Sequence, residues 1–181
     1  MHLTDVELEA GLESIRGAPR GQGVVDLIVR RPAIDEREVL PRAELDPTRG
    51  LIGADWLRRP TKGPDPTPRR DVQIAIMSSR VAALVAGPVD RWPLSGDQLF
   101  VDLDLSEDAL PIGTRLSVGT AVIEISPHPH RGCAKFAERF GPDAVRFVNS
   151  TAGRDLRLRG VNAMVIVAGV VIPGDAIRGI G

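Results

Sequence analysis

The run Leu99-Phe100-Val101-Asp102-Leu103-Asp104-Leu105 decides the fold of this chain. Apolar and acidic residues alternate in it with a period of two, which is typical of a β-strand that has one buried face and one solvated face. The spacing places Asp102 and Asp104 together on the outer face. We therefore predict a half-buried strand that belongs to a sheet with an inner and an outer side.

Further short strands are predicted on both sides of this run. These segments are rich in apolar and β-branched residues, and they cover 24–30, 38–45, 72–77, 115–118, 121–125, 163–167 and 170–172. Gly119-Thr120 joins two of them as a hairpin, and Pro41 interrupts another, which favours an edge or a bulge. Short helices are expected at 79–85, 133–140 and 143–148. The fold class is mainly β with short helices (α+β), arranged as a β-barrel or strongly bent sheet.

The N-terminal residues are predicted to form a helix that precedes the barrel. Thr4 and Glu7 make a capping box, an apolar stripe follows, and Gly17 fits the end of the helix. We expect residues 1–22 to be a helical extension and residues 23–181 to form the barrel domain. The length of 181 residues fits one main domain.

The composition of the chain argues against nucleic acid and membranes as partners. The net charge of −1 provides no overall field for a polyanion, and an aromatic content of 3% leaves few stacking platforms, so nucleic acid is not expected. The longest apolar run, 164–173, is too short to span a bilayer. The N-terminus lacks a basic region followed by an apolar stretch, and the single cysteine cannot form an internal disulfide. We expect a cytoplasmic protein with a free thiol and no membrane contact.

That cysteine, Cys133, lies in the segment of greatest chemical interest, residues 127–136. Arg131 and Lys135 place positive charge beside the thiol, and a helix that starts at residue 132 or 133 would favour an anion there. His128 and His130 are candidates to take or relay a proton. A thiolate in this setting accepts sulfur as a persulfide, binds a soft metal or responds to oxidants. A buried, inert cysteine that packs as a small hydrophobe is the alternative.

A second basic group follows Asn149. We predict a strand at 156–160, on which Arg157 and Arg159 share one face and hold a phosphate or another oxyanion together with Asn149. A solvated strand face is the alternative. The acidic residues Asp97, Asp102 and Asp104 are candidates for a divalent-ion site, but the period-two spacing instead places Asp102 and Asp104 on the outer face of a strand. The His-Pro-His spacing does not match common zinc sites. The proline-rich stretch 59–70 is expected to be an exposed loop.

Several of these segments resemble one known family. The stretches Gly96–Ser106 and Leu110–Leu116, the cysteine segment 123–136, and the segments 146–150 and 157–160 are similar to MOSC domains of the small stand-alone bacterial type. These domains also form the C-terminal part of molybdenum cofactor sulfurases. The resemblance covers roughly residues 23 to 178.

The resemblance implies a β-barrel with the cysteine at the mouth of a pocket. Family members handle sulfur or the molybdenum–pterin cofactor (molybdopterin), so Cys133 would carry a persulfide or ligate molybdenum, tuned by His128 and His130. The residues that would hold the anionic cofactor are Arg131, Lys135, Asn149, Arg157 and Arg159. A cysteine desulfurase or a molybdoenzyme is the implied partner. The chain has no aminotransferase-like segment, so pyridoxal phosphate is not expected. A non-catalytic barrel module that binds a small anion or a partner protein, with a buried cysteine, is the alternative function.

Overall fold

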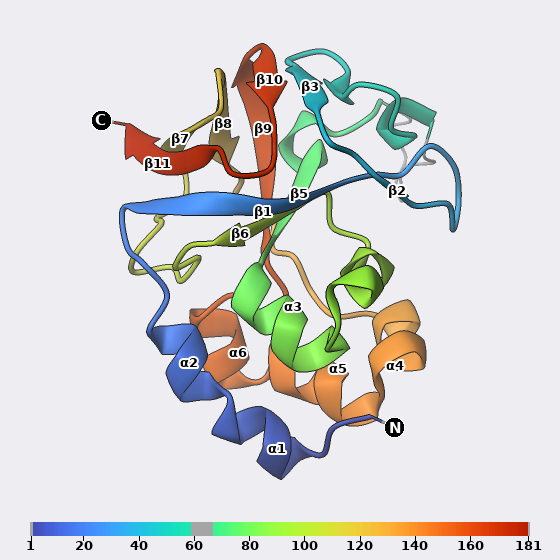
Figure 1. Cartoon of the computed structure of the whole chain (residues 1–181), viewed down its shortest axis with the longest axis vertical. Helices are drawn as coiled ribbons and strands as arrows, with labels where there is room; N and C mark the ends of the chain where they lie inside the picture. The colour runs from blue at the N-terminus through green and yellow to red at the C-terminus, as the bar shows by residue number, and fades with distance from the viewer. Residues whose placement is uncertain (1, 59–66, 181) are drawn as a thin grey trace.

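A computed structural model describes residues 2–58 and 67–180 (Figure 1). Most of the predicted proline-rich loop lies outside the described residues. The helices are α1 (Asp5–Ala10), α2 (Leu12–Arg16), α3 (Ser79–Ala86), α4 (Ala134–Phe140), α5 (Pro142–Asn149) and α6 (Thr151–Asp155), with 3-10 turns η1 (Trp56–Arg58), η2 (Arg70–Val72) and η3 (Val89–Ser95). The strands are β1 (Gln22–Arg30), β2 (Glu38–Val39), β3 (Ala43–Asp46), β4 (Gly50–Leu51), β5 (Ile74–Ser78), β6 (Leu99–Asp102), β7 (Arg115–Val118), β8 (Ala121–Ile125), β9 (Val161–Val167), β10 (Gly169–Val171) and β11 (Ala176–Ile180).

Seven of the strands close into a mixed β-barrel. Their order is β11-β7-β8-β9-β5-β6-β1, and β11 pairs with β1 to complete the ring. Only the β5–β6 pairing within this ring is parallel. β2 extends the sheet beyond β1, and β10, β3 and β4 form a small separate sheet. The predicted barrel of mainly β structure with short helices is therefore confirmed.

At strand β6, the wall of the barrel is buried on both its inner and its outer face. Leu99 and Val101 of β6 point into the barrel core, whereas Phe100 between them packs with the helices outside. Figure 1 shows those helices gathered at one end of the molecule, below the strands. The outer cluster joins Phe100 to Phe136 of α4 and Phe147 of α5. This helical layer makes the barrel wall at β6 apolar on both faces.

The prediction of one half-buried strand over 99–105 is accordingly only partly right. The strand ends at Asp102, and its first three residues are all buried. Asp102 and Asp104 do lie on the outside, where they pair with Arg80 and Arg20. The alternation described the last part of the run correctly. It could not reveal that helices from distant segments cover Phe100.

The N-terminal helices begin as predicted. The Thr4 hydroxyl accepts from the backbone N–H of Glu7, and the Glu7 carboxylate accepts from the backbone N–H of Thr4. Leu8 and Ile15 are buried in the outer cluster, so α1 and α2 pack against the rest of the molecule. Within residues 2–58 and 67–180, no helix has the length and apolar character needed to cross a bilayer.

Candidate functional site

Cys133 lies where the loop after β8 meets α4. It is the N-cap residue of that helix, its carbonyl accepts from the backbone N–H groups of Phe136 and Ala137, and α4 itself begins at Ala134. Its side chain is exposed and free. The alternative of a buried cysteine is therefore wrong. Exposure makes the thiol accessible to a reagent or to the thiol of another protein.

Asn149 fixes the backbone immediately before the cysteine. Its side-chain Oδ1 accepts from the Gly132 N–H at 2.9 Å, and its Nδ2 donates to the Gly132 carbonyl at 3.0 Å. A Cβ at Gly132 would lie 2.9 Å from methyl groups of Val145 and Val148, so α5 packs directly against this glycine. Asn149 uses its amide on the loop, and thereby positions Cys133.

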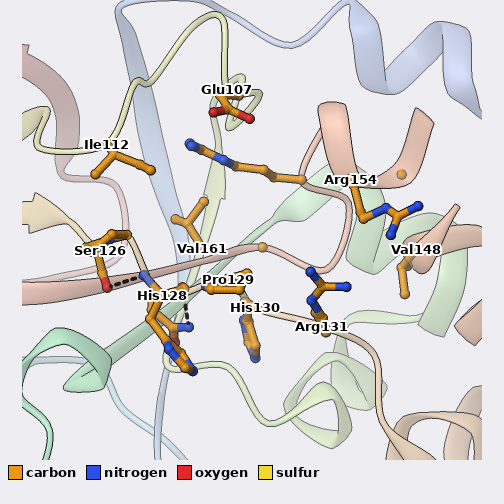
Figure 2. A pocket seen from close by; sticks show the side chains of 15 residues that line it. Glu107, Ile112, Ser126, His128, Pro129, His130, Arg131, Val148, Arg154 and Val161 are labelled. Atoms are coloured by element: carbon orange, nitrogen blue, oxygen red, sulfur yellow. Dashed lines mark hydrogen bonds between the residues drawn. The ribbon is translucent and has the colours of Figure 1, made fainter. Parts of the chain in front are cut away.

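The start of the same loop is held from β8 and β9. Ser126 Oγ accepts from the His128 N–H at 2.9 Å, and Asn162 Nδ2 donates to the His128 carbonyl at 3.1 Å (Figure 2). Both ends of the loop are thus anchored to the barrel wall or the helices. This leaves the side chains of His128, His130 and Arg131 to line the cavities on either side.

The first cavity, which we call the cysteine pocket, has a volume of about 300 Å³. Cys133 and His130 line it together with residues from the β1–β2 loop and from α4. Asp35 and Asp55 are the carboxylates in its wall. The cationic residues of the wall outnumber them and are Arg31, Arg37, Arg131, Lys135, Arg139 and Arg159.

A buried ion pair forms the floor of the cysteine pocket. Arg159 Nη1 lies 2.7 Å from Asp97 Oδ2 and 3.0 Å from Oδ1, and Arg159 Nη2 donates to the Ser95 carbonyl at 2.8 Å. The Ser95 hydroxyl donates to Asp97 at 2.7 Å, and the Arg159 guanidinium lies 5.0 Å from the centre of the Phe136 ring. Burial alone would raise the pKa of the Asp97 carboxyl, but the Arg159 charge and these hydrogen bonds outweigh burial and lower it.

His130 stands next to this pair. Its Nδ1 is 3.5 Å from Asp97 Oδ1, without the geometry of a hydrogen bond. Burial first, and then the nearby Arg159 charge, lower the pKa of His130 from 6.5 to about 4, although Asp97 opposes the shift. The imidazole is therefore neutral near pH 7, and it is a weak base.

The second cavity, which we call the His128 pocket, lies on the other side of the loop and has a volume of about 190 Å³. His128, Arg154 and Arg157 line it, whereas Cys133 does not. His130 and Arg131 line both cavities. Both histidines therefore line the His128 pocket, but only His130 also lines the cysteine pocket.

The strand predicted at 156–160 is wrong, and the error changes the site. Arg157 has a left-handed backbone with φ of 47°, and Gly160 N–H donates to its carbonyl at 2.7 Å, which makes this segment a turn between α6 and β9. Arg157 and Arg159 consequently do not share a face. Arg159 enters the floor of the cysteine pocket, and Arg157 lines the His128 pocket.

The predicted acidic cluster is also dispersed. Asp97 is paired with Arg159, whereas Asp102 and Asp104 pair with arginines on the outer surface. Within the described ranges 2–58 and 67–180, no group of three metal-ligating side chains is found. Sequence reasoning weighed Asp97 only as a metal ligand and missed it as the partner of Arg159. The available signal was a carboxylate two residues before a buried strand.

No protein-family model matches the chain, and no curated protein matches it. The structure is similar to solved structures. The YuaD protein from Bacillus subtilis is 20% identical with a TM-score of 0.64, over 88% of this chain and 96% of that chain. YiiM from Escherichia coli is 16% identical with a TM-score of 0.57, over 87% and 70% of the two chains.

YiiM from Geobacillus stearothermophilus is 16% identical with a TM-score of 0.53, over 88% of this chain and 73% of that chain. The YiiM proteins are MOSC-domain proteins. The chain has a MOSC-like fold. At these identities the likeness concerns the fold alone.

Proposed function

We propose that this MOSC-like protein is a sulfur carrier that holds sulfur as a persulfide on Cys133. One observation carries the proposal: the exposed Cys133 opens into a pocket whose wall holds more cationic than anionic side chains. A thiolate and a persulfide are both anions, and a cationic wall stabilises them. Exposure supplies the access that a second protein's thiol needs.

The transfer step is an exchange between two sulfur atoms. The Cys133 thiolate attacks the outer sulfur of a donor persulfide, the S–S bond of the donor breaks, and a new S–S bond forms on Cys133. The donor leaves as a thiolate, so electrons balance and no external oxidant is required. A cysteine desulfurase is the class of donor that presents such a persulfide, and a molybdoenzyme or its maturation partner is the proposed acceptor.

The surrounding residues fit this exchange without a strong base. Arg131 makes no ion pair or hydrogen bond through its side chain within the described part of the chain, so its charge is available to an anion in the pocket. Lys135 forms an ion pair with Asp35, in which Nζ lies 3.0 Å from Oδ1. His130, with a pKa of about 4, contributes a neutral wall and is poorly suited to remove a proton.

The test is intact-mass analysis after incubation with a cysteine desulfurase and cysteine. The wild-type protein should gain the mass of one sulfur atom, and reduction should remove it. Cys133→Ser should gain nothing, and Asp175→Asn, a remote surface change, should behave like the wild type. Absence of a Cys133-dependent gain would refute the carrier function.

The surplus of positive charge favours a second candidate, binding of the molybdenum–pterin cofactor. The donor set fits this group, because a cysteine sulfur suits a soft metal and guanidinium or ammonium groups suit a phosphate. Cys133 would supply the sulfur ligand, and Arg131 and Lys135 would hold the phosphate. When bound, the group would supply a redox-active metal. Metal analysis of protein produced in a host that makes the cofactor tests this candidate: stoichiometric molybdenum, lost in Cys133→Ser, would support it, and absence of molybdenum would exclude it.

A further inference from the structure

The His128 pocket has apolar walls and a cationic edge. Ile112, Val148 and Val161 contribute apolar surface, as do the prolines of the 127–129 segment. The cationic side chains come from three separate segments: the loop before α4, α6 and the turn after it. Glu107 is the single carboxylate that lines the cavity, and Figure 2 shows it well apart from Arg131 and Arg154.

Arg157 is the most constrained of these cations. It is half-buried, and its Nη1 donates to the carbonyls of Leu110 at 2.6 Å and Leu105 at 3.5 Å. Its left-handed backbone is a conformation that costs a residue with a side chain about 1 kcal/mol or more. Burial lowers the pKa of the Arg157 guanidinium, and the charge of Glu107 opposes this shift without the two side chains forming an ion pair. The fold thus holds a partly desolvated positive charge against the cavity, fixed by two backbone carbonyls and balanced only through space by Glu107.

Arg131 and Arg154, in contrast to Arg157, have no partner among the described residues. Most arginines of the described residues contact a carboxylate or a backbone carbonyl, as Arg80 does with Asp102 and Arg139 does with Asp35. The side chains of Arg131 and Arg154 make no such contact within residues 2–58 and 67–180. Two guanidinium groups without a partner, beside a third that backbone carbonyls hold in place, are an arrangement on one small cavity that an anion would complete.

We propose that the His128 pocket binds a small organic anion. Its oxyanion head would lie among Arg131, Arg154 and Arg157, and its apolar body against Ile112, Val148 and Val161. The volume of about 190 Å³ is below the roughly 300–1,000 Å³ of pockets for drug-sized ligands, so the ligand is a small carboxylate or phosphate ester. The site is separate from Cys133, and this proposal does not depend on the carrier function.

The test is titration of the full-length protein with butyrate, benzoate, phenyl phosphate and inorganic phosphate, with benzyl alcohol as the uncharged probe. Binding is followed by the arginine Nε–Hε NMR signals. The Arg157 signal should shift with the organic anions. Tighter binding of benzoate than of phenyl phosphate would identify a carboxylate as the preferred head group, and the reverse order would identify a phosphate ester. Equal binding of benzyl alcohol, or no saturable shift with any organic anion at tens of millimolar, would overturn the proposal.

Two surface variants test the same site without disturbing the core. Arg154→Ala should weaken binding of the preferred anion about tenfold, which is the size expected for one charge-assisted hydrogen bond, whereas Arg16→Ala, an exposed arginine on α2, should not. Ile112→Asp places a carboxylate at the pocket and should abolish binding, whereas Val6→Asp, at an exposed apolar position on α1, should leave it unchanged. Equal effects of the site and control variants would mean diffuse charge attraction only and would refute a built site.

Discussion

The two pockets on either side of the cysteine loop use their cations differently. In the cysteine pocket, Arg159 is neutralised by Asp97 from below, and Asp35 contacts both Lys135 and Arg139 at the edge. In the His128 pocket the guanidinium groups form no ion pair with a carboxylate of the described residues, and only the charge of Glu107 acts on Arg157 through space. Paired charges shape a wall and moderate its field, whereas unpaired charges are left for a ligand. The comparison suggests a thiol site built mainly from the protein's own ion pairs beside a site that an outside anion completes.

The largest expected effect comes from breaking the buried pair of the cysteine pocket. Asp97→Asn leaves the Arg159 charge buried without a counter-charge, which should lower the free energy of unfolding by about 3–5 kcal/mol. Asp102→Asn breaks the partly exposed pair with Arg80 and should cost less than about 1 kcal/mol. Urea unfolding monitored by circular dichroism measures both. Equal losses for the two variants would show that burial of the pair is not what distinguishes the cysteine pocket.

A smaller loss of folding stability is expected when the pH is lowered. Since the pKa of His130 falls from 6.5 to about 4 on folding, the unfolded chain binds a proton in this range and the folded chain does not. The stabilisation is fully present above pH 6.5 and is lost as the pH falls toward 4, by on the order of 2–3 kcal/mol. Free energies of unfolding between pH 5 and pH 7 should therefore rise with pH. The slope should be shallower in His130→Gln, and an unchanged slope would mean that His130 is not buried as a neutral group.

The backbone beside the cysteine offers a prediction of intermediate size. Gly132→Ala puts a Cβ 2.9 Å from methyl groups of Val145 and Val148, and overpacking of this kind costs about 1–3 kcal/mol. The overpacking should also displace the loop before Cys133 and so alter the rate at which Cys133 reacts with a thiol reagent. Gly179→Ala is the comparison for glycine replacement as such, because its backbone is not left-handed and the nearest atom to its Cβ position is 4.0 Å away. Wild-type stability of Gly132→Ala would contradict the close packing of the loop on α5.

The smallest effect concerns the residue that both pockets share. Arg131→Ala should slow the reaction of Cys133 with a dianionic disulfide reagent by a few-fold, because one unpaired charge of the cysteine pocket is lost. Arg154→Ala should leave that rate unchanged, since Arg154 lines only the His128 pocket. The difference should shrink as salt is added. Stopped-flow absorbance measures the rates, and equal slowing by both variants would remove the distinction between the pockets.

Much of the barrel could be predicted from local patterns. The hairpin across Gly119, the interruption at Pro41 and the capping box at Thr4 depend on neighbouring residues, and each is found in the structure. The double burial of Phe100 was beyond reach, because the helices that cover it come from segments far along the chain. Periodicity reports which residues share a face, but it does not report what covers the other face.

The site was predicted less completely for a related reason. Cys133, His130, Arg131, Lys135 and Arg159 do meet in one pocket, as their grouping indicated. Arg157 leaves that group because its left-handed backbone turns the chain, and no sequence rule favours that conformation for arginine. The role of Asn149 on Gly132 and the pairing of Asp97 with Arg159 required the three-dimensional arrangement.

The central claim, that Cys133 carries sulfur, is tested most directly by loading followed by discharge. Protein loaded by a cysteine desulfurase is separated from the donor and treated with cyanide, which takes the outer sulfur as thiocyanate and leaves the Cys133 thiolate. The account predicts one thiocyanate per loaded chain and return of the protein to its original mass, with none from Cys133→Ser. Loading that is absent, or thiocyanate that forms equally from Cys133→Ser, would contradict it.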